Sequence, residues 1–417
     1  NNLDWNGIQV NVNTYKAKDV PALKSEAFIT TMKDYLSRFR FQLSSINIPG
    51  SFNQSYMGNW NKLGSELLEG ELIGKQYLQK SRLKSAMDEL GSTEGSDLEK
   101  AKQIHKFITS KIDWNGNLGI AANEALNKVY EKQSGNGAAI NLLFAGLLNE
   151  HGVKATPALI STRTHGNPMP LYPVLNQFNH LIVRAEVDGK VKFFDVSDEL
   201  RPVNCMRVNS LNRLALVLEK ENTRWEEIIP EMGMDVFYIE ASLDEEGMLS
   251  GVLKGNYRGY NAIPEKERYQ KNKEGAHWLI RLEEKYPEIE LGEIQFFNLD
   301  KPNETFKDEV EFEIEEAILD GGEQIYFDPI IYTAMLQENP LKLEERTYPV
   351  QIPYPFREQY VLVLSLPEGY ALAEMPVSTN LSLPNKGGRF RYVVSEKEGK
   401  IQLVVNFDLM QLEFSPE

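Results

Sequence analysis

Hydrophobic and polar positions follow different periods in successive parts of this chain. Up to about residue 55 they alternate as in strands, apart from a helical spacing over Ala22 to Ser37. From Trp60 to about Leu90 the apolar residues recur at helical spacing. The small, polar stretch Gly91 to Gly95 then predicts a boundary. We therefore interpret the first 90 residues as a β/α segment that precedes the rest of the fold.

The middle of the chain is predicted to form two helices and then three strands. Ser96 and Glu99 have the spacing of a capping box, and the helix that they open is expected to end near Trp114. A second helix is apolar nearly all round, so we expect it to be buried over Ala138 to Glu150. The strands follow at Ala155 to Ser161, Leu181 to Val187 and Val191 to Val196, and the last two flank the strong hairpin signal Asp188-Gly189.

The remainder, from Met234 onward, is predicted to be mostly strands. A helical pattern interrupts them over Pro264 to Tyr286. Val310, Phe312 and Ile314 alternate with glutamates, as in a half-buried strand with an acidic outer face. This pattern predicts a β-sandwich region over 231–417, with room for two subdomains.

The charge of the chain narrows the classes of partner. It has 45 Lys and Arg against 61 Asp and Glu, a formal net charge of −16. Nucleic-acid binding needs a basic face for the phosphates, so we exclude nucleic acid as a partner. The longest apolar stretch, Ala138 to Leu148, is far shorter than the roughly 20 residues of a bilayer span, so we expect no membrane span.

Metal and disulfide chemistry find little support in the sequence. The lone cysteine, Cys205, has no partner for an intramolecular disulfide and is interpreted as a small apolar core residue. Acidic residues over Glu309 to Glu315 alternate along a strand instead of converging in a loop, which favours a solvated face over a calcium site. The five histidines lack metal-ligand spacing, so we predict no metal and no cofactor; they are His105, His151, His165, His180 and His277.

A possible catalytic arrangement lies between Gln133 and Ser197. Counting outward from the Asp188-Gly189 turn places His180 nearly opposite Asp195 on the neighbouring strand. Directly opposed residues have Cβ atoms about 4.5–5.5 Å apart, so the carboxylate can accept a hydrogen bond from one ring nitrogen and orient the other. The start of the buried helix beside this pair would suit a cysteine nucleophile, because the helix dipole and an imidazolium both lower the pKa of a thiol.

The same residues carry a resemblance to a known family. The stretches Gly135-Asn136-Gly137, Asn179-His180 and Asp195-Val196-Ser197 resemble a transglutaminase-like domain of the papain-like cysteine fold. In that family a Gly-x-Cys motif opens the helix, a His starts a strand and an Asp ends the next strand. The resemblance implies an α+β fold, with a papain-like transglutaminase core over 91–230 and the β-sandwich region after it.

Position 137 departs from the family pattern. The resemblance places the family's cysteine at Gly137, its histidine at His180 and its aspartate at Asp195, and Gly137 has no side chain to attack an acyl carbon. We therefore expect a non-catalytic protein in which His180 and Asp195 are vestigial. The degenerate cleft between the Gly137 helix and the hairpin is expected to hold a peptide or acyl-amide-like ligand, as part of a peptide-, protein- or glycan-binding or assembly module.

The flanks resemble large exported bacterial proteins that place such a core between β-domains. The resemblance rests on Val20-Pro21-Ala22-Leu23, Tyr348-Pro349-Val350 and Pro367-Glu368-Gly369-Tyr370. It implies that residues 1–90 are the remnant of a preceding β-domain together with helices that pack on the core. It also implies that Asn1 lies within a longer protein, and that the protein is periplasmic or otherwise exported. The oligomeric state stays open.

Two other functions remain open at this stage. The first is a hydrolase or acyltransferase with a substitute nucleophile, drawn from Ser134, Ser161, Thr162, Thr164 and Cys205. The second is a surface adhesion or scaffold protein that binds through its β-rich half. A Pro- and Gly-rich loop, Thr164 to Tyr172, gives the best hint of binding, and we expect it to cover the cleft, where Met169 and Tyr172 could contact a ligand.

Overall fold

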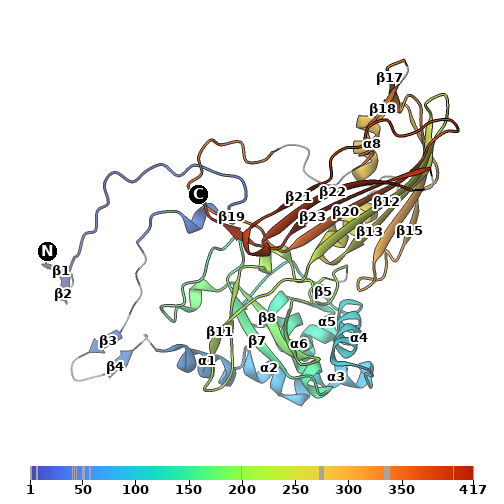
Figure 1. The fold of residues 1–417 in the computed structure, drawn as a ribbon. Helices are drawn as coiled ribbons and strands as arrows, with labels where there is room; N and C mark the ends of the chain where they lie inside the picture. The colour runs from blue at the N-terminus through green and yellow to red at the C-terminus, as the bar shows by residue number, and fades with distance from the viewer. Residues whose placement is uncertain are drawn as a thin grey trace.

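The fold is mixed α+β with several sheets, seen in a computed structural model (Figure 1). The structure describes residues 2–5, 8–39, 41, 43, 45–48, 52–55, 58–198, 200–271, 277–322, 324–332, 339–397 and 399–416. Among these, none of the helices combines the length and the apolar composition that a bilayer span requires.

Helices dominate the chain between residues 60 and 150, as the spacing of apolar residues predicts. They are α1 (Trp60–Glu69), α2 (Gly74–Leu78), α3 (Lys80–Leu90), α4 (Asp97–Thr109), α5 (Leu126–Lys132) and α6 (Gly137–Glu150). The capping box at the start of α4 is confirmed, since Ser96 and Glu99 each accept a hydrogen bond from the other's backbone N–H. Helix α6 is buried over nearly its whole length, also as predicted.

Helix α4 ends earlier than the apolar pattern predicts. We expected it to reach about Trp114, but it stops at Thr109. The Thr109 and Ser110 hydroxyls donate hydrogen bonds to the carbonyls of His105 and Phe107, which competes with continuation of the helix. The chain then forms β5 (Asp113–Trp114), which pairs in parallel with β6 (Ser134–Gly135) just before α6.

A five-stranded sheet supports α6. Its strand order is β11-β10-β7-β8-β9, with bounds β7 (Ala155–Ile160), β8 (His180–Val187), β9 (Lys190–Phe194), β10 (Leu214–Val217) and β11 (Arg224–Glu227). Helix α6 packs on β7 and β8. The predicted hairpin is confirmed, because Asp188 and Gly189 both have positive φ and the ladder runs from Val187↔Lys190 to Val183↔Phe194.

A single nine-stranded sheet forms most of the C-terminal half, extending away from helices α1 to α6 in Figure 1. Its order is β14-β16-β13-β12-β20-β23-β22-β21, and β15 also pairs with β16. The bounds are β12 (Gly233–Leu243), β13 (Leu249–Arg258), β14 (Ile289–Leu291), β15 (Gln295–Phe297), β16 (Phe306–Ile314), β20 (Phe356–Ser365), β21 (Thr379–Ser382), β22 (Gly388–Lys397) and β23 (Lys400–Leu409).

The prediction of a β-sandwich is wrong for the part of the chain that the structure describes. The buried face of the nine-stranded sheet is covered by α7 (Ala262–Lys271), α8 (His277–Lys285) and the segment at Ile331 and Tyr332, not by a second large sheet. Alternation of apolar and polar residues shows that one face of a sheet is buried, but it does not reveal whether a sheet or a helix covers it.

Short two-stranded pairs and 3-10 turns complete the described chain. The pairs are β1 (Asn2–Trp5) with β2 (Ile8–Asn11), β3 (Ser45–Ile48) with β4 (Phe52–Ser55), β17 (Ile318–Asp320) with β18 (Ile325–Phe327), and β19 (Val350–Gln351) with β24 (Glu413–Phe414). The turns are η1 (Met32–Asp34), η2 (Leu175–Gln177), η3 (Val208–Ser210), η4 (Gly259–Asn261) and η5 (Pro384–Lys386).

The N-terminal segment is extended where a helix was predicted. Over Ala22 to Ser37 only η1 forms, so this prediction is wrong. The Glu26 carboxylate accepts hydrogen bonds from the backbone N–H groups of Thr347 (2.9 Å) and Tyr348 (3.2 Å). Contacts with a segment more than 300 residues away therefore replace local helical bonds, and helix propensity is weak enough for such contacts to override it.

A buried carboxyl group in the nine-stranded sheet should make the stability of the fold depend on pH. Burial, together with the charges of Glu358 and Glu265, raises the pKa of Asp235 to about 7, although Asn261 donates a hydrogen bond to it. The folded state therefore binds a proton that the unfolded state releases between about pH 4 and pH 7, and the associated stability is lost as the pH rises through 7.

Asp235→Asn imitates the protonated carboxyl at every pH. We expect it to increase the free energy of unfolding by about 1–3 kcal/mol at pH 8 and to change it little at pH 4. Urea unfolding at both pH values measures the difference. The exposed Asp88→Asn is the matched control and should give no gain at either pH. An equal gain from Asp235→Asn at both pH values would contradict the assignment.

Candidate functional site

The candidate site is built where α6 begins. Asn136 caps the helix by accepting a hydrogen bond from the backbone N–H of Ala139 (2.9 Å), and its amide donates to the carbonyl of Ala121 (3.0 Å). The backbone N–H of Gly137 donates to the carbonyl of Asn117 (2.9 Å), which fixes the Trp114 to Asn117 loop beside the helix. Gly137 is thus the first helical residue, held on both sides by neighbouring loops.

The structure brings His180 and Asp195 together, as the register predicts. His180 is the first residue of β8, and its Nε2 lies 3.1 Å from Oδ2 of Asp195, just after β9. Both side chains are fully buried, with 0% of the His180 side chain exposed to solvent. Gly137, His180 and Asp195 therefore meet at one place, although residues 137 and 195 are far apart in the chain.

The Asp195 carboxylate is surrounded by hydrogen-bond donors. Oδ1 accepts from the Asn141 amide (3.1 Å) and from the Ser197 hydroxyl (3.1 Å), and Oδ2 accepts from the Ser210 hydroxyl (3.0 Å) as well as from His180. Burial opposes ionisation, but the charges of His180 and Arg207 and these hydrogen bonds outweigh it and lower the pKa of Asp195 well below its usual range. The carboxylate is therefore ionised.

When the His180 ring is neutral, this network fixes which of its two nitrogens carries the hydrogen. An ionised carboxylate only accepts hydrogen bonds, so Nε2 carries the hydrogen and Nδ1 presents its lone pair. Nδ1 is buried and has no hydrogen-bond partner among the residues that the structure describes. A Cβ atom added to Gly137 would lie 3.4 Å from Nδ1 and 2.7 Å from Cε1, so the ring faces the bare α-carbon directly.

An aromatic side chain and a guanidinium cover the same site. The Trp114 indole lies beside Gly137, with its Nε1 3.6 Å from the position of an added Cβ, and it donates to the carbonyl of Asn117 (2.8 Å). The Arg207 guanidinium stacks 3.7 Å above the Trp114 ring and also donates to the Ser197 hydroxyl. Trp114 and Arg207 therefore lie next to the start of α6, where the His180 imidazole is fully buried.

Two of the hydroxyls considered as substitute nucleophiles, those of Thr162 and Ser161, have other partners. Thr162 Oγ1 accepts from the Asn179 amide (2.8 Å). Ser161 Oγ lies 2.9 Å from Nδ1 of His165, but it donates its hydrogen to the carbonyl of Gly166, so the imidazole can only donate to it. A base activates a hydroxyl by accepting its hydrogen, and this pair has the opposite polarity. Within the described part of the chain, no hydrogen bond joins Ser134 or Thr164 to His180 either.

Cys205 is not part of the site. It is buried with Ile182 and Tyr260 on the face of the five-stranded sheet opposite to α6. Burial, with the charge of Glu231, raises the pKa of the Cys205 thiol to about 12. Such a thiol is almost entirely protonated at neutral pH and is a poor nucleophile.

The chemistry of Cys205 can be tested with a thiol reagent. We expect iodoacetamide at pH 8 to leave the native protein unmodified over an hour, and to modify one thiol per chain once urea unfolds it. Intact-protein mass spectrometry measures both states. Rapid alkylation of the native protein would show that Cys205 is reactive, and would reopen its role as a nucleophile.

The loop predicted to contact a ligand lines a cavity of about 940 Å³. Met169 and Tyr172 lie on its wall together with Asp34 and Arg38 of the N-terminal segment, whereas neither Gly137 nor His180 lines it. The loop therefore faces the N-terminal segment. We expected it to cover the cleft at His180, and it does not line a cavity there. This volume lies in the usual range of small-ligand pockets.

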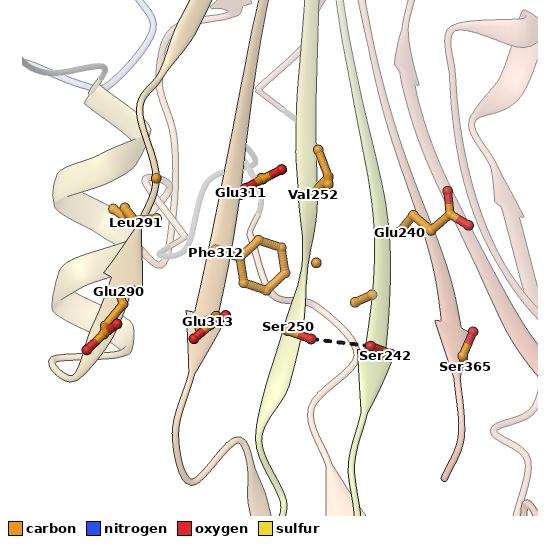
Figure 2. A pocket seen from close by; sticks show the side chains of 13 residues that line it. Glu240, Ser242, Ser250, Val252, Glu290, Leu291, Glu311, Phe312, Glu313 and Ser365 are labelled. Carbon is orange, nitrogen blue, oxygen red and sulfur yellow. Dashed lines mark hydrogen bonds between the residues drawn. The ribbon is translucent and has the colours of Figure 1, made fainter. Parts of the chain in front are cut away.

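A second hollow lies on the outer face of the nine-stranded sheet (Figure 2). It encloses about 640 Å³ and is lined by serines and glutamates that include Ser242, Ser250, Glu311 and Glu313. Figure 2 shows these side chains on neighbouring strands. The Ser242 and Ser250 hydroxyls form a hydrogen bond of 3.3 Å. No group of three or more His, Cys, Asp or Glu side chains among the described residues is arranged to hold a metal ion.

Comparisons with known proteins add two findings. A family model described as a domain of unknown function with a solved structure, DUF3858, matches residues 323–417. A solved structure from Parabacteroides distasonis, provisionally described as a protease, is similar with 14% sequence identity and a TM-score of 0.47, over 86% of this chain and 53% of that one. This chain therefore spans about half the length of that protein. No curated protein matches the chain.

Several residues of the site were not singled out from the sequence. Asn141 carried a usable signal, because it is a polar residue in an otherwise apolar helix, one turn after Gly137. Ser210 and Arg207 carried none, since they lie in irregular chain that only the tertiary fold brings to Asp195 and Trp114.

Proposed function

We propose that this chain is a non-catalytic member of the transglutaminase-like group of papain-like folds that serves as a peptide- or protein-binding module. Gly137 stands at the nucleophile position, and His180 and Asp195 are retained as a structural pair. The observation that carries the proposal is the contact between the His180 ring and the α-carbon of Gly137, where an added Cβ would lie 2.7 Å from Cε1.

The arrangement supports a structural role for the pair more than a chemical one. General-base catalysis needs a nucleophile within about 2.6–3.2 Å of the base and a route for the substrate. Nδ1 of His180 faces a residue without a side chain, and the imidazole is wholly buried. The expected cleft for a ligand against His180 is therefore closed in this structure.

Turnover assays test the absence of catalysis. We expect the protein to hydrolyse p-nitrophenyl acetate and a labelled peptide mixture, and to couple a primary amine to glutamine, no faster than buffer. His180→Gln should give the same rates, with circular dichroism used to show that it is folded. A rate in the wild-type protein that is lost in folded His180→Gln would overturn the proposal.

Because the packing at Gly137 is tight, we expect a side chain at this position to destabilise the fold. Gly137→Ala should lower the free energy of unfolding by about 1–3 kcal/mol, because the new methyl group pushes the His180 ring against its hydrogen bond to Asp195. In a His180→Ala background the same methyl group meets no ring and should cost less than about 0.5 kcal/mol. Urea unfolding of the four proteins measures this coupling, and equal costs in both backgrounds would contradict the contact.

A second candidate function is a scaffold or adhesion protein that binds glycans through its β-rich half. The hollow of about 640 Å³ on the outer sheet face favours it, because hydroxyls and carboxylates there could bond to sugar hydroxyls. A glycan array compares the wild-type protein with Glu311→Gln and Glu313→Gln. Glycan binding that these variants abolish would support this candidate over the first.

A further inference from the structure

The loop from Thr164 to Tyr172 is held rigidly while it exposes large apolar side chains. The backbone N–H of Asn167 donates to Asp34 Oδ1 (2.7 Å), the Trp60 indole donates to the carbonyl of Pro170 (2.8 Å), and the N–H of Thr164 donates to the Asn209 side chain (3.0 Å). Three distant segments thus order the loop before any ligand arrives. A pre-organised surface loses less conformational entropy on binding.

The apolar side chains at the cavity are large and exposed. Met169 is 44% exposed and Tyr172 45% exposed, both on the cavity wall, and their neighbour Leu171 is 74% exposed. Phe41 lines the same cavity from the N-terminal segment, and its ring contacts Tyr15 at 5.4 Å between centroids. Aromatic and methionine side chains are typical of the anchor regions of binding interfaces.

One oxygen of Asp34 and the guanidinium of Arg38, both at the cavity, have no partner among the described residues. Asp34 Oδ1 is bonded to Asn167, but Oδ2 is buried and has no hydrogen-bond partner among the described residues. The Arg38 guanidinium also lines the cavity and has no ion pair or hydrogen bond within the described part of the chain. A buried acceptor without a donor costs about 1–3 kcal/mol, which a ligand N–H would recover.

These groups define the chemistry of a matching ligand. Asp34 can accept a hydrogen bond from a ligand donor, and Arg38 can pair with a ligand anion. Met169 and Tyr172 can pack against an apolar group of the ligand. An extended peptide supplies all three, because it has backbone N–H groups, a carboxylate and side chains that alternate along its length.

We propose that the cavity lined by Asp34, Arg38 and Phe41 on one side and by residues 161–177 on the other binds an extended peptide that carries a bulky apolar side chain close to a carboxylate. This inference rests on the proposed function and names its ligand class. The Asp34 carboxylate receives a peptide N–H, the Arg38 guanidinium pairs with the peptide carboxylate, and the apolar side chain packs on Met169 and Tyr172.

Fluorescence polarisation with synthetic peptides tests the proposal on the whole chain. The probe is a pool of fluorescein-labelled nonapeptides with Leu or Phe at position 5 and Asp or Glu at position 7. One comparison pool has Asn or Gln at position 7, and another has Ser at position 5. We expect the first pool to bind, and each comparison pool to bind at least tenfold more weakly. Equal binding of the three pools, or no binding of the first at millimolar protein, would overturn the proposal.

Variants locate the binding. Arg38→Gln and Tyr172→Ser should each raise the Kd of the first pool at least tenfold. The matched controls are Arg391→Gln, an exposed arginine on β22, and Tyr370→Ser, a tyrosine that is also 45% exposed, and neither should change the Kd. Melting temperatures show that all four remain folded. Binding that survives both Arg38→Gln and Tyr172→Ser would place the ligand elsewhere and reject the site.

The outcome separates this inference from the proposed function. If the first peptide pool does not bind and no turnover is measured, the cavity is rejected as a peptide site, but the non-catalytic assignment still stands. Turnover that depends on His180 would reject the non-catalytic assignment, whatever the peptide pools do, because His180 does not line the cavity.

Discussion

Asp195→Ala should lower the free energy of unfolding by about 3–5 kcal/mol, the largest effect that we expect from a single substitution. The carboxylate is fully buried and accepts hydrogen bonds from His180, Asn141, Ser197 and Ser210. Its removal leaves these donors without a partner and leaves the charge of Arg207 uncompensated nearby. Removing one partner of a buried, hydrogen-bonded charge pair lowers the free energy of unfolding by about this amount.

Urea unfolding followed by circular dichroism measures this cost. Asp88→Ala removes the same side chain from an exposed position on α3 and should change the free energy of unfolding by no more than about 0.5 kcal/mol. Asp195→Asn is a second test, because it keeps the volume but places an amide among donors, and we expect it to be destabilising as well. A neutral Asp195→Ala would show that the pair does not hold the fold together.

Acid should destabilise the protein through a second histidine, His105. It is buried on α4, its Nε2 lies 3.3 Å from the carbonyl of Asp198, and its Nδ1 has no hydrogen-bond partner among the described residues. Burial lowers the pKa of His105 to about 4, although the Asp198 carbonyl and charge act the other way. The unfolded chain therefore takes up this proton near pH 6.5, before the folded one does.

The difference between the His105 pKa in the unfolded and folded states determines how stability changes with pH. Below pH 6.5 the unfolded state binds more protons than the folded state, so stability falls as the pH falls, until the folded state is also protonated near pH 4. Between pH 7 and pH 4 this difference is worth about 3 kcal/mol.

The neutral variant His105→Gln isolates this contribution from other titrating groups. Wild-type protein should lose about 3 kcal/mol more than His105→Gln between pH 7 and pH 4, measured as the free energy of unfolding in urea. His151→Gln, at a partly buried histidine, is the matched control and should have a smaller effect. Parallel pH profiles for the wild-type protein and His105→Gln would contradict a depressed pKa.

Local signals predicted the part of the fold that surrounds the site. The capping box of Ser96, the apolar run of α6 and the turn at Asp188-Gly189 each specify structure within a few residues, and all three are confirmed. The register of one hairpin was enough to bring His180 close to Asp195, because residue pairing in a two-residue hairpin is fixed by the turn.

Local sequence patterns did not predict contacts between segments that are distant in the chain. Glu26 looks like an ordinary surface residue in a helical pattern, yet it is buried against the Thr347 and Tyr348 backbone. The stacking of Arg207 on Trp114 and the hydrogen bond from Ser210 to Asp195 likewise depend on the packing of loops that are distant in sequence. The same limit explains the β-sandwich prediction, since no strand pattern specifies which element packs on its buried face.

The attachment at Glu26 has a consequence for how the chain folds. Ala27 and Thr30 also bond to Arg346 and Gln351, so this segment is attached to residues that are synthesised more than 300 positions later. Closing a loop of this length costs conformational entropy, so we expect these bonds to form only after residues 346–351 have been brought into place. The N-terminal segment is therefore expected to be the last region to gain protection from hydrogen exchange during refolding, and the first to open when the protein is stressed.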